Sequence, residues 1–283
     1  MSSNTIALIW DFDNTLIKGC MQDPIFDAYH VNAELFWKQK EELGKFYRRQ
    51  GLRVNMDTLY LNLFLQKVKN GELAGLNNQK LTSFGLKQHF CPGIPAFFST
   101  IRQWIEQHPI YVMHDIHLEH YIVSNGMAAI IRGCALASET AAIWGCEYAD
   151  TCGENALLDE IIYTVDHTAK TRILFEINKG LNRDVNARIP PNEKRIPFSN
   201  MIYIADGQSD IPAFSLITER GGTAFGVYHR DQPYTLLQVK QLYSDGRLSA
   251  FVEADYSPSS PAFELIKAKV SQIADNLCST RDS

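Results

Sequence analysis

The sequence predicts an α/β protein: a doubly wound parallel sheet with an all-helical segment inserted just after the first strand. Three observations support this fold class. Residues 5–10 are predicted to form a strand, and residues 6–10 are an unbroken apolar run, which is typical of a strand buried in the middle of a parallel sheet. Residues 25–90 show helical spacing and no convincing strand. From residue 93 onward, stretches that favour strands alternate with stretches that favour helices.

The inserted segment is predicted to contain helices at residues 28–51, 55–73 and 81–90. Asn55 or Asp57 is expected to cap the second of these, because both side chains can accept a hydrogen bond from the first turn of a helix. The segment closes at the turn signal Cys91-Pro92-Gly93. We therefore expect a core of residues 1–18 and 92–283, with a helical cap of residues 19–91.

The elements predicted after the cap alternate along the chain. Helices are expected at residues 94–108, 127–136, 168–180, 211–219 and 261–277, and strands at residues 120–126, 141–150, 157–165, 201–205, 223–228 and 250–256. Thr168 is placed to cap the helix of residues 168–180, and Gly180 is placed to end it. Residues 181–200 are predicted to form a long polar loop.

The bulk composition is that of a globular protein with room for a sizeable core: 283 residues, 45% of them hydrophobic and 21% charged. A net charge of -5 argues against a nucleic-acid partner, which usually selects for a basic surface. No apolar run approaches the roughly 20 residues needed to span a bilayer. The six cysteines are scattered without metal-site spacing, so we expect reduced thiols and a cytoplasmic protein.

Polar residues follow three of the predicted strands directly. Asp11 and Asp13 follow the first, Ser124 and Asn125 end the second, and Asp206 and Asp210 follow the strand of residues 201–205. Ligands of open α/β sheets bind beyond the carboxyl ends of the strands, so neighbouring strands would bring these carboxylates into one hollow. A hard cation such as Mg²⁺, with Lys170 near the start of its helix, would offset their repulsion.

Such a hollow suits phosphoryl chemistry. A carboxylate can attack a phosphoryl group to give an aspartyl-phosphate, which water then hydrolyses. A cation and a lysine would offset the repulsion between the attacking carboxylate and the phosphate. A second carboxyl group two residues on can protonate the leaving oxygen and later activate the water.

These motifs resemble those of the haloacid dehalogenase-like hydrolases, in particular the helical-cap phosphatases of the phosphoserine-phosphatase type. Four motifs match in order: DFDNT (residues 11–15), the serine of IVSNG (122–126), the lysine of TAKTRILFEI (168–177) and ADGQSD (205–210). The resemblance implies a Rossmann-like core and a helical cap after the first strand. It also implies a Mg²⁺-dependent phosphatase acting on a small phosphorylated metabolite.

The resemblance assigns roles to the matching residues. Asp11 would be the nucleophile and Asp13 the general acid and base. Mg²⁺ would be held by the Asp11 side chain, the Asp13 backbone carbonyl and Asp206. Asp210 would support the metal site without binding the ion directly. Ser124, with Asn125 beside it, and Lys170 would bind phosphoryl oxygens. The presence of Asp13 favours phosphate-ester hydrolysis over dehalogenation.

Two positions depart from the pattern of the resembled phosphatases. Cys20 stands where phosphoserine phosphatases place a glutamate that holds the substrate amine, which argues against phosphoserine as substrate. Ala205 stands where the family often has glycine, and we expect little effect from it. The substrate and the oligomeric state stay open. A phosphotransferase with an acceptor other than water, or a non-catalytic module that binds a phosphorylated ligand, is the alternative.

Several side chains have a simpler interpretation beside the functional one. Asp11 and Asp13 could form a turn, Ser124 could belong to an ordinary loop, and Asp210 could cap the helix that follows it. Lys179 rivals Lys170 as the lysine of the third motif. The cluster His114, Asp115, His117 and His120 is expected to be a surface loop rather than a metal site. In the loop of residues 181–200, the basic residues Arg183, Arg188, Lys194 and Arg195 are expected to be solvated. The cap arginines Arg48, Arg49 and Arg53 face solvent or grip an anionic part of the substrate.

Overall fold

A seven-stranded sheet, in the order β4-β3-β2-β1-β5-β6-β7, forms the centre of the computed structural model, which describes residues 4–181 and 183–282. The strands are β1 (Thr5–Trp10), β2 (His117–Met127), β3 (Ala142–Asp150), β4 (Leu158–Tyr163), β5 (Met201–Ala205), β6 (Thr223–Tyr228) and β7 (Ala250–Glu253). Neighbouring strands are parallel except β3 and β4. A mostly parallel sheet confirms the predicted fold class. β4 runs antiparallel because residues 151–157 are too short a connection for the crossover that a parallel return needs.

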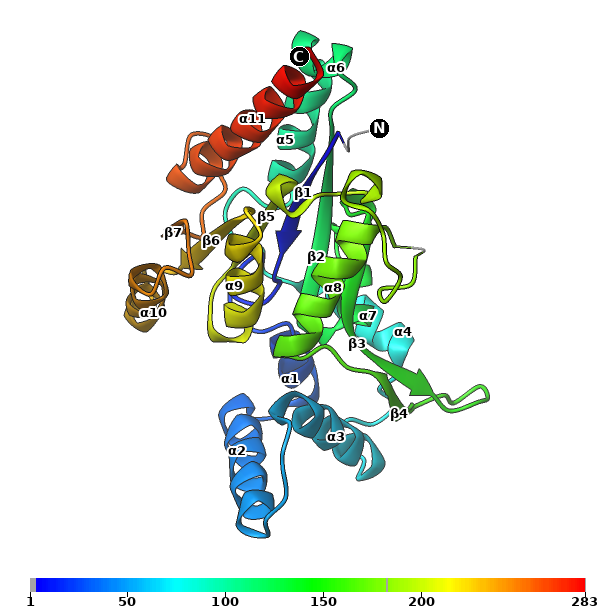
Figure 1. Ribbon diagram of the computed structural model, residues 1–283. Coiled ribbons are helices and arrows are strands. Elements are labelled where there is room, and N and C mark those ends of the chain that lie inside the picture. The colour runs from blue at the N-terminus through cyan, green and yellow to red at the C-terminus, as the bar shows by residue number, and fades with distance from the viewer. Residues whose placement is uncertain (1–3, 182, 283) are drawn as a thin grey trace.

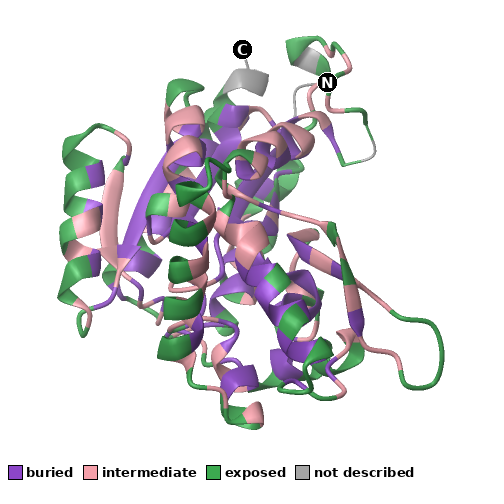
Figure 2. Ribbon diagram, turned by 90° about the horizontal axis from the view of Figure 1, so that it is seen from below, coloured by how far each residue is buried: buried purple, intermediate pink, exposed green. Residues whose placement is uncertain are grey.

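The first strand is buried along its whole length. β1 pairs with β2 on one side and β5 on the other, and all six of its residues are buried. This is why its sequence is an unbroken apolar run rather than an alternating one. Figure 2 shows the central strands in purple between helices whose outer faces are green.

Helices cover both faces of the sheet. After the cap they are α5 (Ala96–Gln107), α6 (Pro109–Met113), α7 (Ala128–Arg132), α8 (His167–Lys179), α9 (Ile211–Glu219), α10 (Pro233–Ser244) and α11 (Pro261–Asp282). α8 and α9 pack side by side, α5 contacts β2, and α11 contacts β1 and β7 (Figure 1). The five predicted helices of the core are confirmed, whereas α6 and α10 were not predicted. In the part of the chain that the structure describes, no helix is both long and apolar enough to cross a membrane.

The start of α8 corrects the predicted cap. Asp166 is the N-cap residue, and its Oδ1 accepts hydrogen bonds from the backbone N–H groups of Thr168 (3.0 Å) and Ala169 (2.7 Å). Thr168 therefore lies inside the first turn, where its hydroxyl donates to Asp166. Gly180 ends the helix, as predicted, with a φ of 105° that favours glycine.

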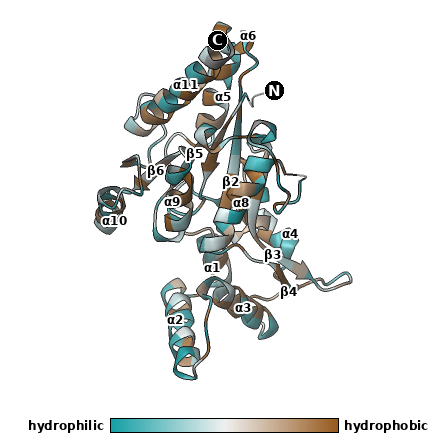
Figure 3. Cartoon of the chain, viewed as in Figure 1, coloured by the Kyte–Doolittle hydropathy of each residue, from teal (hydrophilic) through white to brown (hydrophobic). Residues whose placement is uncertain are grey.

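The inserted segment is helical. Its helices are α1 (Asp23–Tyr29), α2 (Ala33–Arg49), α3 (Met56–Lys69) and α4 (Asn78–Phe84). α2 and α3 lie beyond the end of the sheet opposite α6 (Figure 1). Their common core is aromatic, with Phe26, Phe36 and Phe64 in mutual contact, while the outer surface of α2 is largely hydrophilic (Figure 3). The side chain of Asn55 caps α3, as predicted for this residue or Asp57.

A second attachment joins the cap to the core besides the two chain connections. The β3–β4 hairpin contacts the cap. The Tyr148 hydroxyl donates a hydrogen bond to the carbonyl of Leu61 in α3 (2.9 Å). Asn78 Nδ2 donates to the carbonyl of Tyr148 (2.9 Å), and the backbone N–H of Leu158 donates to that of Leu76 (3.0 Å). The hairpin therefore fixes α3 and α4 relative to the sheet.

Replacement of Tyr148 by phenylalanine should weaken this attachment. The variant Tyr148→Phe keeps the ring, which is 4% exposed, but loses the buried hydrogen bond to Leu61. We expect the free energy of unfolding to fall by about 1 kcal/mol, measured by urea denaturation. Tyr234→Phe, at an exposed tyrosine, is the matched control and should change stability by less than about 0.5 kcal/mol. Equal stability of Tyr148→Phe and the unaltered protein would show that the hairpin contact contributes nothing.

Candidate active site

The predicted site residues meet at the C-terminal ends of the parallel strands. Asp11 follows β1, Asp206 follows β5, and Ser124 lies near the end of β2. Because β1 lies between β2 and β5, these three positions are neighbours. They surround a hollow of about 190 Å³ lined by Asp11, Asp13, Asn14, Ser124, Asn125, Asp206 and Ser209. The predicted convergence is therefore present, although β2 continues through Ser124 to Met127, with an irregular register against β3.

Lys170 holds two of the carboxylates together. Its Nζ lies 2.8 Å from Asp11 Oδ1 and 2.6 Å from Asp210 Oδ1, and all three side chains are buried. The Tyr203 hydroxyl donates to the same Asp210 oxygen (2.6 Å), and the Ser209 hydroxyl donates to Asp210 Oδ2 (2.8 Å). Asp210 occupies the N-cap position of α9 but makes no capping hydrogen bond with its side chain. Its carboxylate instead accepts a hydrogen bond from Lys170 and so orients the lysine side chain.

Burial and mutual repulsion raise the pKa values of the carboxyl groups in the hollow. Burial raises the pKa of Asp11 to about 6 even though Lys170 opposes the shift. Burial and the charge of Asp11 raise the pKa of Asp13 to about 8. Burial, Asp11 and Asp210 raise the pKa of Asp206 well above its usual value. Burial alone would lower the pKa of Lys170, but the carboxylates of Asp11 and Asp210 raise it above its usual value.

The oxygen atoms of this cluster fit a hard divalent cation. Carboxylate oxygens of Asp11, Asp206 and Asp210 all lie within 4.8 Å of one another. A donor set made of oxygen alone suits Mg²⁺, and the excess of negative charge would be relieved by it. The side chain of Asp13 is not in this group, since its Oδ1 accepts a hydrogen bond from the backbone N–H of Met21 (2.9 Å).

The loop after β1 is held by residues that the sequence did not indicate. Asn14 has a φ of 51°, and its carbonyl accepts a hydrogen bond from His229 Nε2 (2.8 Å). The Tyr256 hydroxyl donates to the carbonyl of Thr15 (2.9 Å). Both donors lie more than 200 positions away in the sequence, and no local pattern links them to this loop. They fix the backbone that presents Asp11 and Asp13.

The cap reaches the hollow through the first turns of α3. Asn125 Nδ2 donates to Asp57 Oδ2 (3.1 Å), and the Tyr60 hydroxyl donates to the carbonyl of Asn125 (2.8 Å). Asp57 also lies 3.7 Å from His167 Nε2, at the first turn of α8. Asn125 is therefore positioned by the cap as well as by β2, a contact that spans 68 residues of sequence.

Lys179, the alternative to Lys170, and Arg195 both make their contacts outside the hollow. Lys179 Nζ donates to the backbone carbonyls of Val185 and Ala187 (2.7 Å to the latter), so this lysine binds its own loop. In the loop of residues 181–200, Arg195 pairs with Glu119 and Tyr121 rather than being purely solvated.

The histidine cluster lies only partly in the surface loop that we predicted, because only His114 and Asp115 are in the turn after α6. His117 and His120 both belong to β2, because the strand begins earlier than expected. His120 is fully buried, accepts a hydrogen bond at Nδ1 from Trp10 Nε1 (3.2 Å) and stacks on Phe98. Burial lowers its pKa to about 3, so the ring is neutral. It is a core residue, not a metal ligand.

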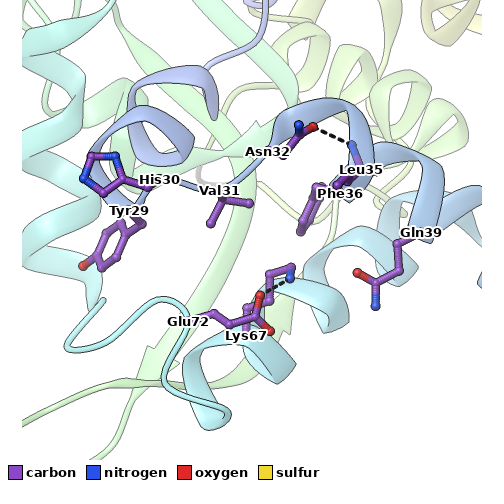
Figure 4. Close-up of a pocket in the computed structure, with 9 residues that line it drawn as sticks. All are labelled: Tyr29, His30, Val31, Asn32, Leu35, Phe36, Gln39, Lys67 and Glu72. Atoms are coloured by element: carbon purple, nitrogen blue, oxygen red, sulfur yellow. Dashed lines mark hydrogen bonds and ion pairs between the residues drawn. The ribbon is translucent and has the colours of Figure 1, made fainter.

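A second hollow, of about 240 Å³, lies within the cap (Figure 4). Residues of the end of α1, the α1–α2 turn, α2 and α3 line it, among them Tyr29, Phe36 and Gln39. The charged groups at its edge, Lys67 and Glu72, pair with each other. It lacks the convergent carboxylates of the hollow at the sheet edge, which is therefore the candidate active site.

No protein-family model matches the chain. A protein of Borreliella burgdorferi described as uncharacterized is 35% identical over 286 residues, covering 94% of this chain and 97% of its own. The two chains belong to one family.

Solved structures give the fold a name. A substrate-bound phosphoserine phosphatase superposes with a TM-score of 0.55 at 14% identity, covering 94% of this chain and 99% of its own. A HAD (haloacid dehalogenase-like) family hydrolase of Salmonella enterica serovar Typhi does so with a TM-score of 0.52 at 15% identity, covering 89% and 67%. The chain has the HAD-like fold. The HAD-like core carries the sheet edge with the hollow, and α1–α4 occupy the place of the cap.

The raised pKa values predict a pH-dependent effect of Mg²⁺ on stability. In the folded protein Asp11 and Asp13 hold protons up to a pH of about 6 and about 8. In the unfolded chain they lose them near pH 4 (about 3.9). Without metal, stability should therefore fall as the pH rises from about 4 to about 8. Because Mg²⁺ binds only ionised carboxylates, its effect on the melting temperature should be larger at about pH 7.5 than at about pH 5.

Replacement of Asp206 by asparagine is the test of this metal effect. The variant removes a buried, repelled carboxylate, so at about pH 7.5 and without metal it should be at least as stable as the unaltered protein. It should also lose the Mg²⁺-dependent rise in melting temperature. Asp245→Asn, at an exposed aspartate on the far end of α10, is the control and should keep that rise. An equal Mg²⁺ effect at both pH values, or an unchanged effect in Asp206→Asn, would contradict this assignment.

Proposed function

We propose that this protein is a Mg²⁺-dependent phosphatase that hydrolyses a phosphate monoester of a small metabolite through a phosphoryl group carried on Asp11. One observation carries the proposal. A buried carboxylate, Asp11, is fixed by Lys170 at 2.8 Å within the same hollow as Asp13 and Ser124. A nucleophile, a proton donor and phosphate-binding groups are thus available around a single point.

In the first step, the Asp11 oxygen that does not bond Lys170 attacks the phosphorus atom. The new Asp11–phosphorus bond forms as the bond from phosphorus to the ester oxygen breaks. The leaving oxygen takes the proton of Asp13, which is present at neutral pH because the pKa of this carboxyl is about 8. Ser124 donates its hydroxyl hydrogen to a phosphoryl oxygen, and Lys170 keeps the Asp11 carboxylate oriented.

In the second step, the Asp13 carboxylate accepts a proton from water. The water oxygen bonds to phosphorus, the Asp11–phosphorus bond breaks, and inorganic phosphate leaves. Asp13 is again protonated and Asp11 is again a free carboxylate. When bound, Mg²⁺ would offset negative charge on the phosphoryl group, held by the Asp11 and Asp206 side chains and by the Asp13 backbone carbonyl. Asp210 would support this site by holding Lys170.

The proposal extends to organisation and location. We assign catalysis to a core of residues 1–18 and 92–283 and substrate selection to a cap of residues 19–91. We expect the protein to act in the cytoplasm on a metabolite, without a nucleic-acid or membrane partner. In the part of the chain that the structure describes, the six cysteines form no disulfide with one another, and this and the negative net charge support the expectation.

Asp11→Asn tests the nucleophile. An amide has nearly the shape of the carboxylate but is a poor nucleophile, so kcat for p-nitrophenyl phosphate should fall by at least about 10³-fold while the melting curve stays cooperative. Asp27→Asn, at an exposed aspartate of α1, is the control and should keep full activity. If Asp11→Asn retained a large fraction of the activity, covalent catalysis by this residue would be excluded.

Asp13→Asn tests the proton donor. Alkyl alcohols leave poorly without a proton, whereas nitrophenolate leaves readily. The variant should therefore lose about 10²–10⁴-fold in kcat/KM on an alkyl phosphate and clearly less on p-nitrophenyl phosphate. Equal losses on both substrates would argue against leaving-group protonation by Asp13.

A further inference from the structure

A strand in the middle of the sheet carries a buried hydroxyl group. All five residues of β5 are buried, and the other four are methionine, isoleucine or alanine. Tyr203 is the exception: its ring is fully buried and packs edge-on against Phe214 of α9, with ring centroids 5.6 Å apart. Burying a hydroxyl group costs free energy unless the group has a hydrogen-bond partner, a cost that an apolar ring would not carry. Packing alone therefore does not explain the phenol.

The partner of this hydroxyl begins a chain of buried contacts that ends at Asp11. The Tyr203 hydroxyl donates to Asp210 Oδ1 (2.6 Å). The same oxygen accepts a hydrogen bond from Lys170 Nζ (2.6 Å), and Lys170 also donates to Asp11 Oδ1 (2.8 Å). Tyr203, Asp210 and Lys170 are all fully buried, so each of these bonds is made where water does not weaken it.

Tyr203 is a rigid donor, whereas the other donors to Asp210 are flexible. Its hydroxyl is held by a strand that lies between β1 and β6. Lys170 has a flexible four-carbon stem, so the position of its ammonium group depends on the groups around it. The Ser209 hydroxyl, which donates to Asp210 Oδ2 (2.8 Å), can rotate. Tyr203 therefore fixes the direction of the Asp210 carboxylate.

A phenol fixes Asp210 without adding a charge. Carboxylate oxygens of Asp11, Asp206 and Asp210 lie within 4.8 Å of one another, so their repulsion favours rotation of Asp210 away from its observed position. A neutral donor opposes that rotation. A second cation at this position would also do so, but it would reduce the excess of negative charge that the cluster offers to Mg²⁺.

We propose that Tyr203 is a positioning residue for the nucleophile. Its hydroxyl fixes the carboxylate of Asp210, Asp210 fixes the ammonium group of Lys170, and Lys170 fixes the oxygen of Asp11 that does not attack. This inference rests on the proposed phosphatase function and adds to it a residue that does not line the hollow. Because a misplacement of about 1 Å can cost about 10²-fold in rate, loss of the hydroxyl should slow the chemical step rather than weaken substrate binding.

Tyr203→Phe keeps the ring and its packing on Phe214 but removes the hydroxyl. With saturating Mg²⁺, kcat for p-nitrophenyl phosphate should fall by about 10–100-fold, while KM should rise by less than about twofold. Tyr111→Phe is the matched control, since Tyr111 is 3% exposed and its hydroxyl donates to Asp275 Oδ1 (2.9 Å). This contact joins α6 and α11 at the end of the molecule away from the cap (Figure 1). The control should lose as much stability and keep full kcat.

Two further measurements separate positioning from packing. Para-aminophenylalanine placed at position 203 keeps a hydrogen-bond donor and should recover most of the lost kcat; it also serves if Tyr203→Phe melts early. In an Asp210→Asn background, measured at high enzyme concentration, Tyr203→Phe should lower kcat by less than about threefold further, because the hydroxyl acts through that carboxylate.

Four results would overturn the proposal: unchanged kcat in Tyr203→Phe, a loss confined to KM, an equal loss in Tyr111→Phe, or losses that multiply fully with that of Asp210→Asn. In each of them the unaltered protein is an active phosphatase. Failure of the unaltered protein to hydrolyse p-nitrophenyl phosphate would instead overturn the proposed phosphatase function, and this inference with it.

Discussion

The buried contact of Lys170 with Asp11 and Asp210 is the interaction on which the rest of the site depends. Carboxylates of Asp11, Asp206 and Asp210 gather at the end of a sheet that excludes water. Breaking a buried ion pair by removing one partner costs about 3–5 kcal/mol, because the remaining charge is left uncompensated. Lys170 offsets part of this repulsion and leaves the side that faces the hollow for a cation. Burial and the charge of Asp11 raise the pKa of Asp13 to about 8 and keep it protonated at neutral pH, which is the state that a general acid requires.

The cap covers the candidate site and also contacts one of its residues directly. α3 touches Asn125 through Asp57 and Tyr60, and the β3–β4 hairpin holds α3 from the other side. The position of Asn125 near the end of β2 is therefore coupled to the packing of the cap. Under the proposed function, binding energy from substrate contacts with the cap would reach the reacting centre through this connection and separate one phosphate ester from another.

Much of the fold could be predicted because its signals are local. The apolar run of β1, followed by Asp11 and Asp13, needs only a few residues to indicate a buried strand that ends at a site. The cap of α8 was assigned wrongly because Asp166 and Thr168 are both good capping residues, and the backbone decides between them. α10 was missed because Gln232 and the residues after it supply no side-chain cap that would mark its start.

The rest of the site could not be predicted because it depends on long-range contacts. His120 is a core residue since it bonds Trp10, which is 110 positions away, and His229 reaches Asn14 across 215 positions. In contrast, the antiparallel direction of β4 could have been predicted from the sequence, because the seven residues between β3 and β4 cannot form a parallel crossover.

The most direct test of the account is to find the phosphoryl group on the protein. Asp13→Asn should slow attack by water on the intermediate, so acid quenching of this variant during turnover should trap it. Peptide mass analysis should then find one added phosphoryl group, and fragmentation should place it on Asp11. Phosphate release without any phosphorylated peptide, or a phosphoryl group on a different residue, would contradict the central claim that Asp11 is the nucleophile.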